Sequence, residues 1–184
     1  QIYTSELQNR IELPNHHNIV VVNIQGDEPF IQPDQIKALM DCFPTEIATL
    51  VHPFTVNDTW EDLQNPNYVK VAIARETKGT NNTTIGRALY FSRSVIPYLR
   101  GVEQNEWLLQ GKHFRHIGMY AYRPNVLKEI TALPQGVLER AESLEQLRWL
   151  ENGYKIAVRE TMHESIGIDT PEDLEEAERA LISE

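Results

Sequence analysis

The sequence contains a single cysteine and no long apolar run. Cys42 is alone among 184 residues, so no disulfide can form within the chain, and a reducing compartment fits this composition. No segment approaches the roughly 20 consecutive apolar residues that a membrane-spanning helix requires, and no secretory signal pattern is present. The sequence therefore predicts a cytoplasmic protein without a membrane partner, in which Cys42 packs as a small interior side chain.

Basic side chains are also in short supply. The chain has 17 Lys and Arg against 27 Asp and Glu, which gives a formal net charge of −10. A chain this acidic is repelled by nucleic acids, so an anionic substrate would need a local basic patch. The remaining composition, 41% hydrophobic and 24% charged, is typical of a folded domain, and the length predicts one domain over residues 1–184.

The first half of the chain predicts an α/β fold. Residues 18–24 form a run of β-branched side chains without alternation, which is typical of a strand covered on both faces. A helix with Pro33 in its first turn follows, and its apolar side chains recur at helical spacing. A second strand is predicted at residues 47–52, so strand, helix and strand follow one another as in a βαβ unit.

The remaining elements continue this pattern. We predict strands at 69–74, 88–92, 116–122 and 155–159, an irregular loop at 100–115, and helices at 124–133, at 139–152 and from Thr170 onward. The turn-rich segment between the first two of these strands predicts a hairpin. No internal repeat or flexible linker divides the chain.

The first candidate site is the segment Gln25-Gly26-Asp27-Glu28-Pro29, directly after the first strand. In open α/β sheets, ligands bind beyond the carboxyl ends of the strands, which is where Asp27 falls. Gly26 would allow the backbone to approach a ligand closely. The alternative is that Asp27 only solvates a turn.

A second candidate is Asp169, which precedes Thr170, the predicted N-cap of the last helix. Its charge could simply complement the helix dipole. Alternatively, Asp27 and Asp169 could act together, because Mg²⁺ prefers oxygen ligands and is typically held by one or two carboxylates with substrate phosphates. This interpretation requires the strands before the two aspartates to end near each other.

A third candidate is a locally basic segment in this acidic chain. Six basic or imidazole side chains fall within 24 residues: Arg93, Arg100, Lys112, His113, Arg115 and His116. They could cradle an anion, since arginine suits bidentate carboxylate contacts, or they could belong to a solvated loop. In the helix predicted at 139–152, Glu142 and Gln146 are spaced to share one face, which by default is a solvated face.

Five segments extend this interpretation, because together they resemble the CMP-Kdo synthetase family (3-deoxy-manno-octulosonate cytidylyltransferases). They are VVNIQGDEPFI (21–31), ALYFSRSVIPYLR (88–100), FRHIGMYAYR (114–123), ERAESLEQLRWLENGYKI (139–156) and GIDTPEDLEEAE (167–178). They occur in the order found in that family and cover most of the chain from residue 18 onward. Any one segment is moderately specific, whereas all five in order are a strong signal.

The resemblance implies a Rossmann-like nucleotidyltransferase domain with a mixed, mostly parallel sheet and a small dimerisation subregion that forms a homodimer. It implies transfer of CMP from CTP to 3-deoxy-D-manno-octulosonate (Kdo), with release of diphosphate, for lipopolysaccharide synthesis. By similarity, Asp27 and Asp169 are the catalytic residues that bind Mg²⁺, and Gln25 lies beside the sugar or the nucleotide. The implied Kdo pocket consists of Arg93, His116, Tyr120, Glu142 and Gln146.

The chain departs from the family pattern near its start. The first strand of the family, its loop with the lysine that grips the triphosphate, and its cytosine-reading segment are not seen, and residues 1–17 match only weakly. We therefore expect the chain to lack part of the CTP site. Two alternatives stay open: a CMP-acylneuraminate synthetase, and a non-catalytic binding or assembly module on the same fold. A glycosyltransferase is disfavoured because no Asp-x-Asp pair is found.

Overall fold

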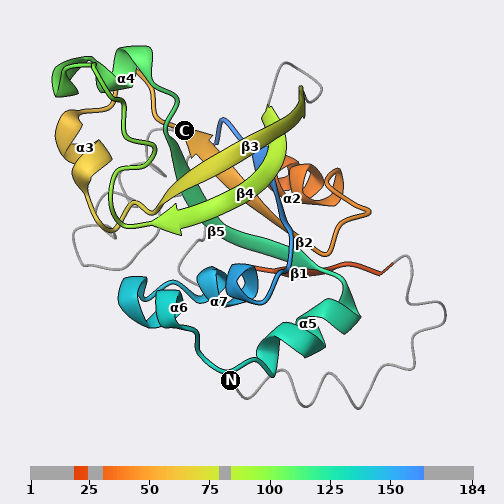
Figure 1. Ribbon diagram of the computed structural model, residues 1–184. Coiled ribbons are helices and arrows are strands. Elements are labelled where there is room, and N and C mark those ends of the chain that lie inside the picture. Colours follow the sequence, from red (N-terminus) through yellow and green to blue (C-terminus); the bar gives the residue numbers. More distant parts are fainter. Residues whose placement is uncertain (1–18, 25–30, 79–83, 164–184) are drawn as a thin grey trace, which may run out of the picture.

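The computed structural model describes residues 19–24, 31–78 and 84–163 of the 184-residue chain (Figure 1). Three predicted site residues, Gln25, Asp27 and Asp169, lie outside these ranges, as does the helix predicted from Thr170. The described residues form a six-stranded sheet and the helices that pack against it.

The described chain contains both strands and helices, as the sequence predicts. In chain order the elements are β1 (Val21–Asn23), α2 (Pro33–Met40), β2 (Ile47–Pro53), α3 (Trp60–Gln64), β3 (Lys70–Lys78), β4 (Thr84–Ser92), the 3₁₀ turn η3 (Gln104–Glu106), α4 (Trp107–Gln110), β5 (Phe114–Tyr122), α5 (Pro124–Thr131), α6 (Val137–Glu142), α7 (Glu145–Glu151) and β6 (Ile156–Glu160). The predicted hairpin is confirmed, because β3 and β4 pair antiparallel.

The sheet is mixed, but the prediction that it is mostly parallel is wrong for the described strands. Their order is β1-β5-β2-β6-β4-β3, and only β2 and β6 pair in parallel. The cause is β5, which lies between β1 and β2 and runs antiparallel to both. The strands of the predicted βαβ unit do run in the same direction, yet a strand from much later in the chain separates them.

Helices cover both faces of the sheet (Figure 1). On β2, Ile47 and Val51 belong to one apolar cluster with α5 and α7, whereas Ala48 and Leu50 belong to a second cluster with α2. Successive side chains of a strand point to opposite faces, so β2 has no solvated side. This explains why its sequence shows no alternation of apolar and polar residues.

A third, smaller cluster lies beside the sheet, beneath η3 and α4. Its buried side chains are Phe54, Leu63 and Trp107. We predicted an irregular loop at 100–115, but this segment contains η3 and the single turn α4. Elements of one turn are too short to produce a helical period in the sequence, which is why they were missed.

The helix predicted at 139–152 is two helices. Ser143 adopts a left-handed conformation, with φ 53° and ψ 45°, which ends α6 at Glu142. The carboxylate of Glu151, at the end of α7, accepts hydrogen bonds from the backbone N–H groups of Val137 (3.0 Å) and Leu138 (3.2 Å). It thus satisfies free donors in the first turn of α6, which fixes α6 against α7.

Two expectations concern the lone cysteine and the membrane. The Cys42 thiol lies 3.4 Å from the carbonyl oxygen of Ala38, and burial raises the pKa of this thiol to about 11. The Cys42 side chain is half-buried and packs against the apolar cluster that contains Leu39, so it is less enclosed than the predicted interior position. A thiol with a raised pKa is unreactive. No helix within the described ranges has the length and apolar character needed to cross a bilayer.

Candidate active site

The carboxyl ends of β1, β2 and β6 lie at the same edge of the sheet. β2 and β6 pair in parallel, and β1 runs in the same direction because β1 and β2 are both antiparallel to β5. Asp27 follows the end of β1, and Asp169 follows β6 later in the chain. A metal site between them requires this common direction. In the described part of the chain, no group of three or more His, Cys, Asp or Glu side chains forms a metal site.

A β-bulge shapes the middle of the sheet. The pairing of β2 with β5 shifts between Thr49, which lies opposite Tyr120, and Leu50, which lies opposite Ile117. Side chains four residues apart on a regular strand are separated by about 13 Å. At the bulge, the rings of His116 and Tyr120 are only 5.3 Å apart between centroids. Bulges of this kind commonly re-aim side chains beside active sites.

The hydroxyl group of Thr49 holds this bulge together. The Thr49 side chain is fully buried on β2. Its Oγ1 atom lies 2.8 Å from the carbonyl oxygen of Met119, 3.2 Å from that of Ile117 and 2.9 Å from Nε2 of His116. One hydroxyl group thereby ties the backbone of the bulge to the imidazole ring. We call Thr49, His116 and Tyr120 the neutral cluster.

His116 is uncharged in this environment. Burial lowers the pKa of the imidazole to about 3, and the ring of Phe91 packs against it edge-on with 5.1 Å between centroids. At neutral pH the ring is therefore a neutral hydrogen-bonding group and cannot act as a cation toward a carboxylate.

Tyr120 contributes a buried hydroxyl group that lacks a hydrogen-bond partner within the described residues. The ring is only 6% exposed and packs edge-on against Trp149 of α7. Burial raises the pKa of the phenol well above its usual value of 10. The nearby hydroxyl of Thr49 opposes this rise, but that hydroxyl already bonds the carbonyl oxygen of Met119 and Nε2 of His116. The phenol stays protonated, and a buried donor without a partner is costly unless a ligand supplies one.

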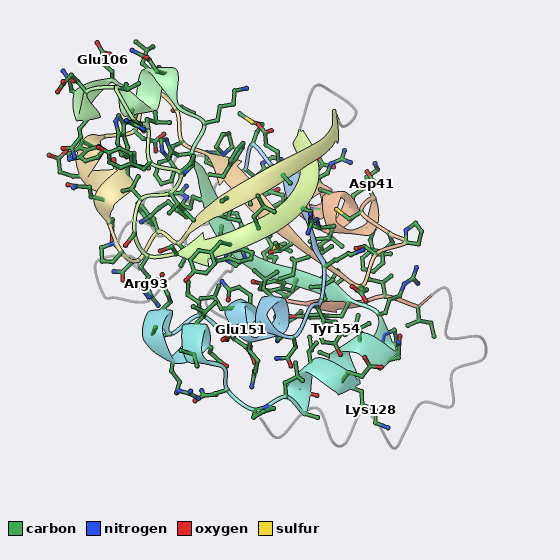
Figure 2. The ribbon with its side chains drawn as sticks, in the orientation of Figure 1. Asp41, Arg93, Glu106, Lys128, Glu151 and Tyr154 are labelled. Atoms are coloured by element: carbon green, nitrogen blue, oxygen red, sulfur yellow. The ribbon has the colours of Figure 1, made fainter. Side chains whose placement is uncertain are left out.

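A second group of polar side chains lies where β4 ends beside α6 (Figure 2). The carboxylate of Glu142 accepts hydrogen bonds from the hydroxyl of Ser92 (2.7 Å) and from the backbone N–H of Arg93 (2.9 Å). In return, Nε of Arg93 donates to the carbonyl oxygen of Glu142 at 2.7 Å. We call Lys70, Arg93 and Glu142 the ionic cluster.

Arg93 and Lys70 both donate to the loop that follows α3. Arg93 donates through Nη1 to the carbonyl oxygen of Pro66 at 2.9 Å, and Lys70 donates through Nζ to that of Asn65 at 2.8 Å. Arg93 also donates through Nη2 to the carbonyl oxygen of Ser143 at 3.5 Å. Its guanidinium group thus clamps this loop to the turn between α6 and α7.

Lys70 is the buried cation of the ionic cluster. Its side chain is fully buried. Burial and, to a smaller extent, the nearby guanidinium of Arg93 lower the pKa of its amine to about 8, whereas Glu142 opposes this shift. At neutral pH the ionic cluster therefore contains two cations and one carboxylate. A buried lysine is expensive to keep charged, so its presence indicates a role in this network.

Comparison with known proteins places the chain in a family. The sequence model of one family, described as cytidylyltransferase, matches residues 6–156. The chain belongs to the cytidylyltransferase family. Two relatives are named 3-deoxy-manno-octulosonate cytidylyltransferase. That of Parabacteroides distasonis is 57% identical over 162 residues, which cover 86% of this chain and 61% of the relative. That of Bacteroides thetaiotaomicron is 57% identical over 165 residues, which cover 88% and 62%.

A solved structure agrees with this assignment. The structure of CMP:2-keto-3-deoxy-manno-octonic acid synthetase complexed with CTP matches 97% of this chain and 65% of its own, with a TM-score of 0.74 and 34% identity. The mixed α/β fold is therefore that of a cytidylyltransferase. The chain spans about three fifths of the length of the relatives that it matches.

Four of the predicted pocket residues lie in two pairs. His116 and Tyr120 meet at the bulge, and Arg93 and Glu142 bond each other. The expectation that Glu142 and Gln146 share a helical face is wrong, because α6 ends at Glu142 and Gln146 lies in α7. Gln146 is only 6% exposed and therefore does not belong to a solvated face.

The predicted basic segment does not act as one cradle. His113 is buried and stacks on Trp107, and Nε2 of its ring lies 3.0 Å from the carbonyl oxygen of Pro97. The guanidinium of Arg115 lies over the ring of Tyr68, with 4.7 Å to its centroid. The side chains of Arg100 and Lys112 are exposed. The basic side chains of this segment therefore lie in separate environments.

Sequence reasoning missed Thr49, Lys70 and Ser92. A weak signal existed for the first two, because each is a polar side chain inside a run of apolar strand residues. Such a side chain is normally depleted from a buried strand and must find partners there. Their partners come from the bulge of β5 and from the loop after α3, which no local pattern reveals.

Proposed function

We propose that the full-length protein containing this chain transfers CMP from CTP to the anomeric hydroxyl group of Kdo and releases diphosphate. The observation that carries the proposal is the 57% identity to two proteins named 3-deoxy-manno-octulosonate cytidylyltransferase across most of this chain. CTP as the nucleotide is supported by the solved structure that the chain resembles, which is complexed with CTP.

In this reaction the anomeric oxygen of Kdo forms a bond to the α-phosphorus of CTP. The bond from the α-phosphorus to the oxygen that bridges to the β-phosphate breaks, diphosphate leaves, and the hydroxyl proton passes to solvent. Transfers of this kind depend on positioning of the reactants and on stabilisation of developing negative charge. The protein must therefore align two anionic substrates rather than form a covalent bond to either.

We assign Asp27 and Asp169 to Mg²⁺ as part of this proposal. Two carboxylates are the donors that Mg²⁺ prefers, and the strands that precede them point to the same edge of the sheet. When bound, Mg²⁺ neutralises charge on the triphosphate. We place Gln25 beside the sugar or the nucleotide, at the same edge.

We assign the acid sugar to the surface formed by the two clusters. His116 and Tyr120 offer neutral hydrogen-bonding groups to sugar hydroxyls, and Tyr120 has a buried hydroxyl without a partner among the described residues. Gln146 lies on α7 in the turn before Trp149, which contacts Tyr120. Arg93 and Glu142 border this surface and hold each other in place.

Two further features belong to the proposal. The cytoplasmic location is supported by the lone cysteine, Cys42. The homodimer is supported by two exposed apolar side chains, Tyr98 and Leu109, each 72% exposed beside the small cluster of Trp107. Light scattering of the full-length protein measures its mass, and a monomer at micromolar concentration would remove the homodimer from the proposal.

The test of the reaction is diphosphate release by the full-length protein with CTP and Mg²⁺, given either Kdo or N-acetylneuraminate. We expect release with Kdo and none with the competing acid. Release with N-acetylneuraminate alone would replace the assigned sugar with an acylneuraminate. No release with either acid, from protein of the expected mass, would favour a binding module.

A further inference from the structure

The surroundings of Thr49 determine the arrangement of protons at His116. A threonine hydroxyl group has one hydrogen to donate and two lone pairs to accept. Three atoms lie within bonding distance of Oγ1: two carbonyl oxygens, at 2.8 and 3.2 Å, and Nε2 of His116, at 2.9 Å. Carbonyl oxygens only accept, so the single hydrogen of Thr49 is needed between Oγ1 and these oxygens.

The opposite arrangement is unfavourable. If Thr49 donated to Nε2 of His116, the oxygen of Met119 would face another oxygen at 2.8 Å without a hydrogen between them. If Nε2 carries a hydrogen and donates to Oγ1, the hydrogen of Thr49 is free to bond the oxygen of Met119 at 2.8 Å, and the longer contact to Ile117 at 3.2 Å shares that same hydrogen. The ring is neutral at neutral pH, because burial lowers its pKa to about 3. A neutral ring with a hydrogen on Nε2 has a lone pair on Nδ1.

We propose that Thr49 is a positioning residue that holds His116 with its hydrogen on Nε2, so that Nδ1 accepts a hydrogen bond from a hydroxyl group of the acid sugar. This inference rests on the proposed function. Nδ1 of His116 has no hydrogen bond to another described residue, which leaves it available to a ligand.

Tyr120 supplies the complementary group. Its hydroxyl is buried and unpartnered among the described residues, and its ring lies 5.3 Å from that of His116. An acceptor on His116 beside a donor on Tyr120 matches a sugar hydroxyl group, which both donates and accepts. The same pair is a poor match for a carboxylate, which only accepts when ionised. The neutral cluster therefore recognises the polyhydroxylated part of the substrate.

Kinetics of matched variants test this role in the full-length protein. Thr49→Val keeps the shape of the side chain and removes the hydroxyl, whereas Thr49→Ser keeps the hydroxyl. We expect Thr49→Val to raise KM for Kdo about tenfold, with kcat and KM for CTP changed less than about twofold. Thr49→Ser should restore KM for Kdo. Thr131→Val, which removes an exposed hydroxyl on α5, is the matched control.

Nitrogen NMR of histidine-labelled protein reads the tautomer directly. The chain has six histidines, and comparison with His116→Asn assigns the signals of His116. We expect Nε2 to be protonated and Nδ1 to be unprotonated in the wild type, and we expect a mixture in Thr49→Val. This readout remains valid if the valine variant is too unstable for kinetics, because the wild type and Thr49→Ser can still be measured.

Two results would overturn the inference: a hydrogen on Nδ1 in the wild type, or an unchanged KM for Kdo in a folded Thr49→Val variant. Neither result requires the proposed function to fail, because the wild type would still release diphosphate with Kdo. Absence of release by the wild type would instead reject the proposed function, whatever the tautomer.

Discussion

The neutral cluster and the ionic cluster hold their polar groups in opposite ways. In the neutral cluster, burial keeps His116 and Tyr120 uncharged, and the Tyr120 hydroxyl has no partner among the described residues. In the ionic cluster, the carboxylate of Glu142 accepts from the backbone N–H of Arg93, and the guanidinium of Arg93 donates to the backbone carbonyl oxygens of Glu142 and Pro66. The two clusters are linked by Phe91, which contacts His116 and precedes Ser92 on β4.

This difference shows that charge alone does not mark the binding surface. Anion binding is one of two interpretations of the basic segment in the sequence. In the structure, the donors of Arg93 are directed at the carbonyl oxygens of Pro66 and Glu142. Among the described residues of the two clusters, the Tyr120 hydroxyl and Nδ1 of His116, both on uncharged rings in the middle of the sheet, have no protein partner. We infer that the ionic cluster sets the shape of the site and that the neutral cluster binds the sugar.

The largest effect is expected outside both clusters, at Asp27. Asp27→Asn keeps the size of the side chain but weakens a proposed ligand of Mg²⁺, so turnover should fall about a thousandfold or more while the melting temperature stays the same. Diphosphate release and thermal unfolding measure the two quantities. Asp34→Asn, at an exposed position in the first turn of α2, is the control. Undiminished turnover in Asp27→Asn would reject the metal role.

Within the clusters, the largest loss of stability is expected at Glu142. Glu142→Gln removes the charge that compensates Lys70 and Arg93, and it should lower the free energy of unfolding by about 2 kcal/mol. Urea denaturation measures this change. Glu106→Gln, on the exposed 3₁₀ turn, is the control (Figure 2). Equal stability of the two variants would show that the ionic cluster has no structural role.

Tyr120→Phe should separate binding from stability. The variant removes a buried hydroxyl without a partner in the described structure, so the free protein should be as stable as the wild type or up to about 1 kcal/mol more stable. KM for Kdo should rise about tenfold, because the bound sugar loses a hydrogen bond. Steady-state kinetics and urea denaturation give both values. A loss of stability with unchanged KM would place this hydroxyl in the scaffold.

A smaller, pH-dependent effect is expected at Lys70. Its pKa is about 8 in the folded protein and 10.5 in its unperturbed state. Between these values the unfolded chain holds a proton that the folded protein has lost, so the stability contributed by this group rises with pH. The charged residues near Lys70 are Arg93, Glu142 and also Arg115, which pairs with Lys70 on the neighbouring strand β5.

Denaturation of wild type and Lys70→Met at a series of pH values tests this expectation. The wild type should gain at least about 1 kcal/mol relative to the variant as the pH rises from 8 toward 10. Lys128→Met, whose side chain points away from the sheet on α5, should show no such trend (Figure 2). A constant difference across this range would show that Lys70 titrates normally.

Local signals in the sequence predicted most helices and strands, but they did not predict which strands pair with each other. Pro33 and Pro124 correctly mark the starts of α2 and α5, since proline suits the first turn of a helix. The break at Ser143 was not predictable, because a left-handed serine has no local signature. Nor was the insertion of β5 between β1 and β2, which depends on contacts about a hundred residues apart in the chain.

The site shows the same limit. Resemblance to a family selected His116, Tyr120, Arg93 and Glu142, and the structure brings them together in two pairs. Thr49 was not found, because a small polar residue in a buried strand acquires its role only from the bulge opposite it. Patterns along one strand carry no information about which backbone carbonyls the facing strand exposes.

Phosphorus NMR of the full-length protein with CTP, Mg²⁺ and Kdo observes both the bond that is made and the bond that is broken in the proposed reaction. We expect loss of the three CTP resonances together with the growth of one phosphodiester resonance and of diphosphate, and we expect no change when Kdo is omitted. CTP resonances that persist in the presence of Kdo, or that disappear equally without it, would show that the protein does not transfer CMP to Kdo.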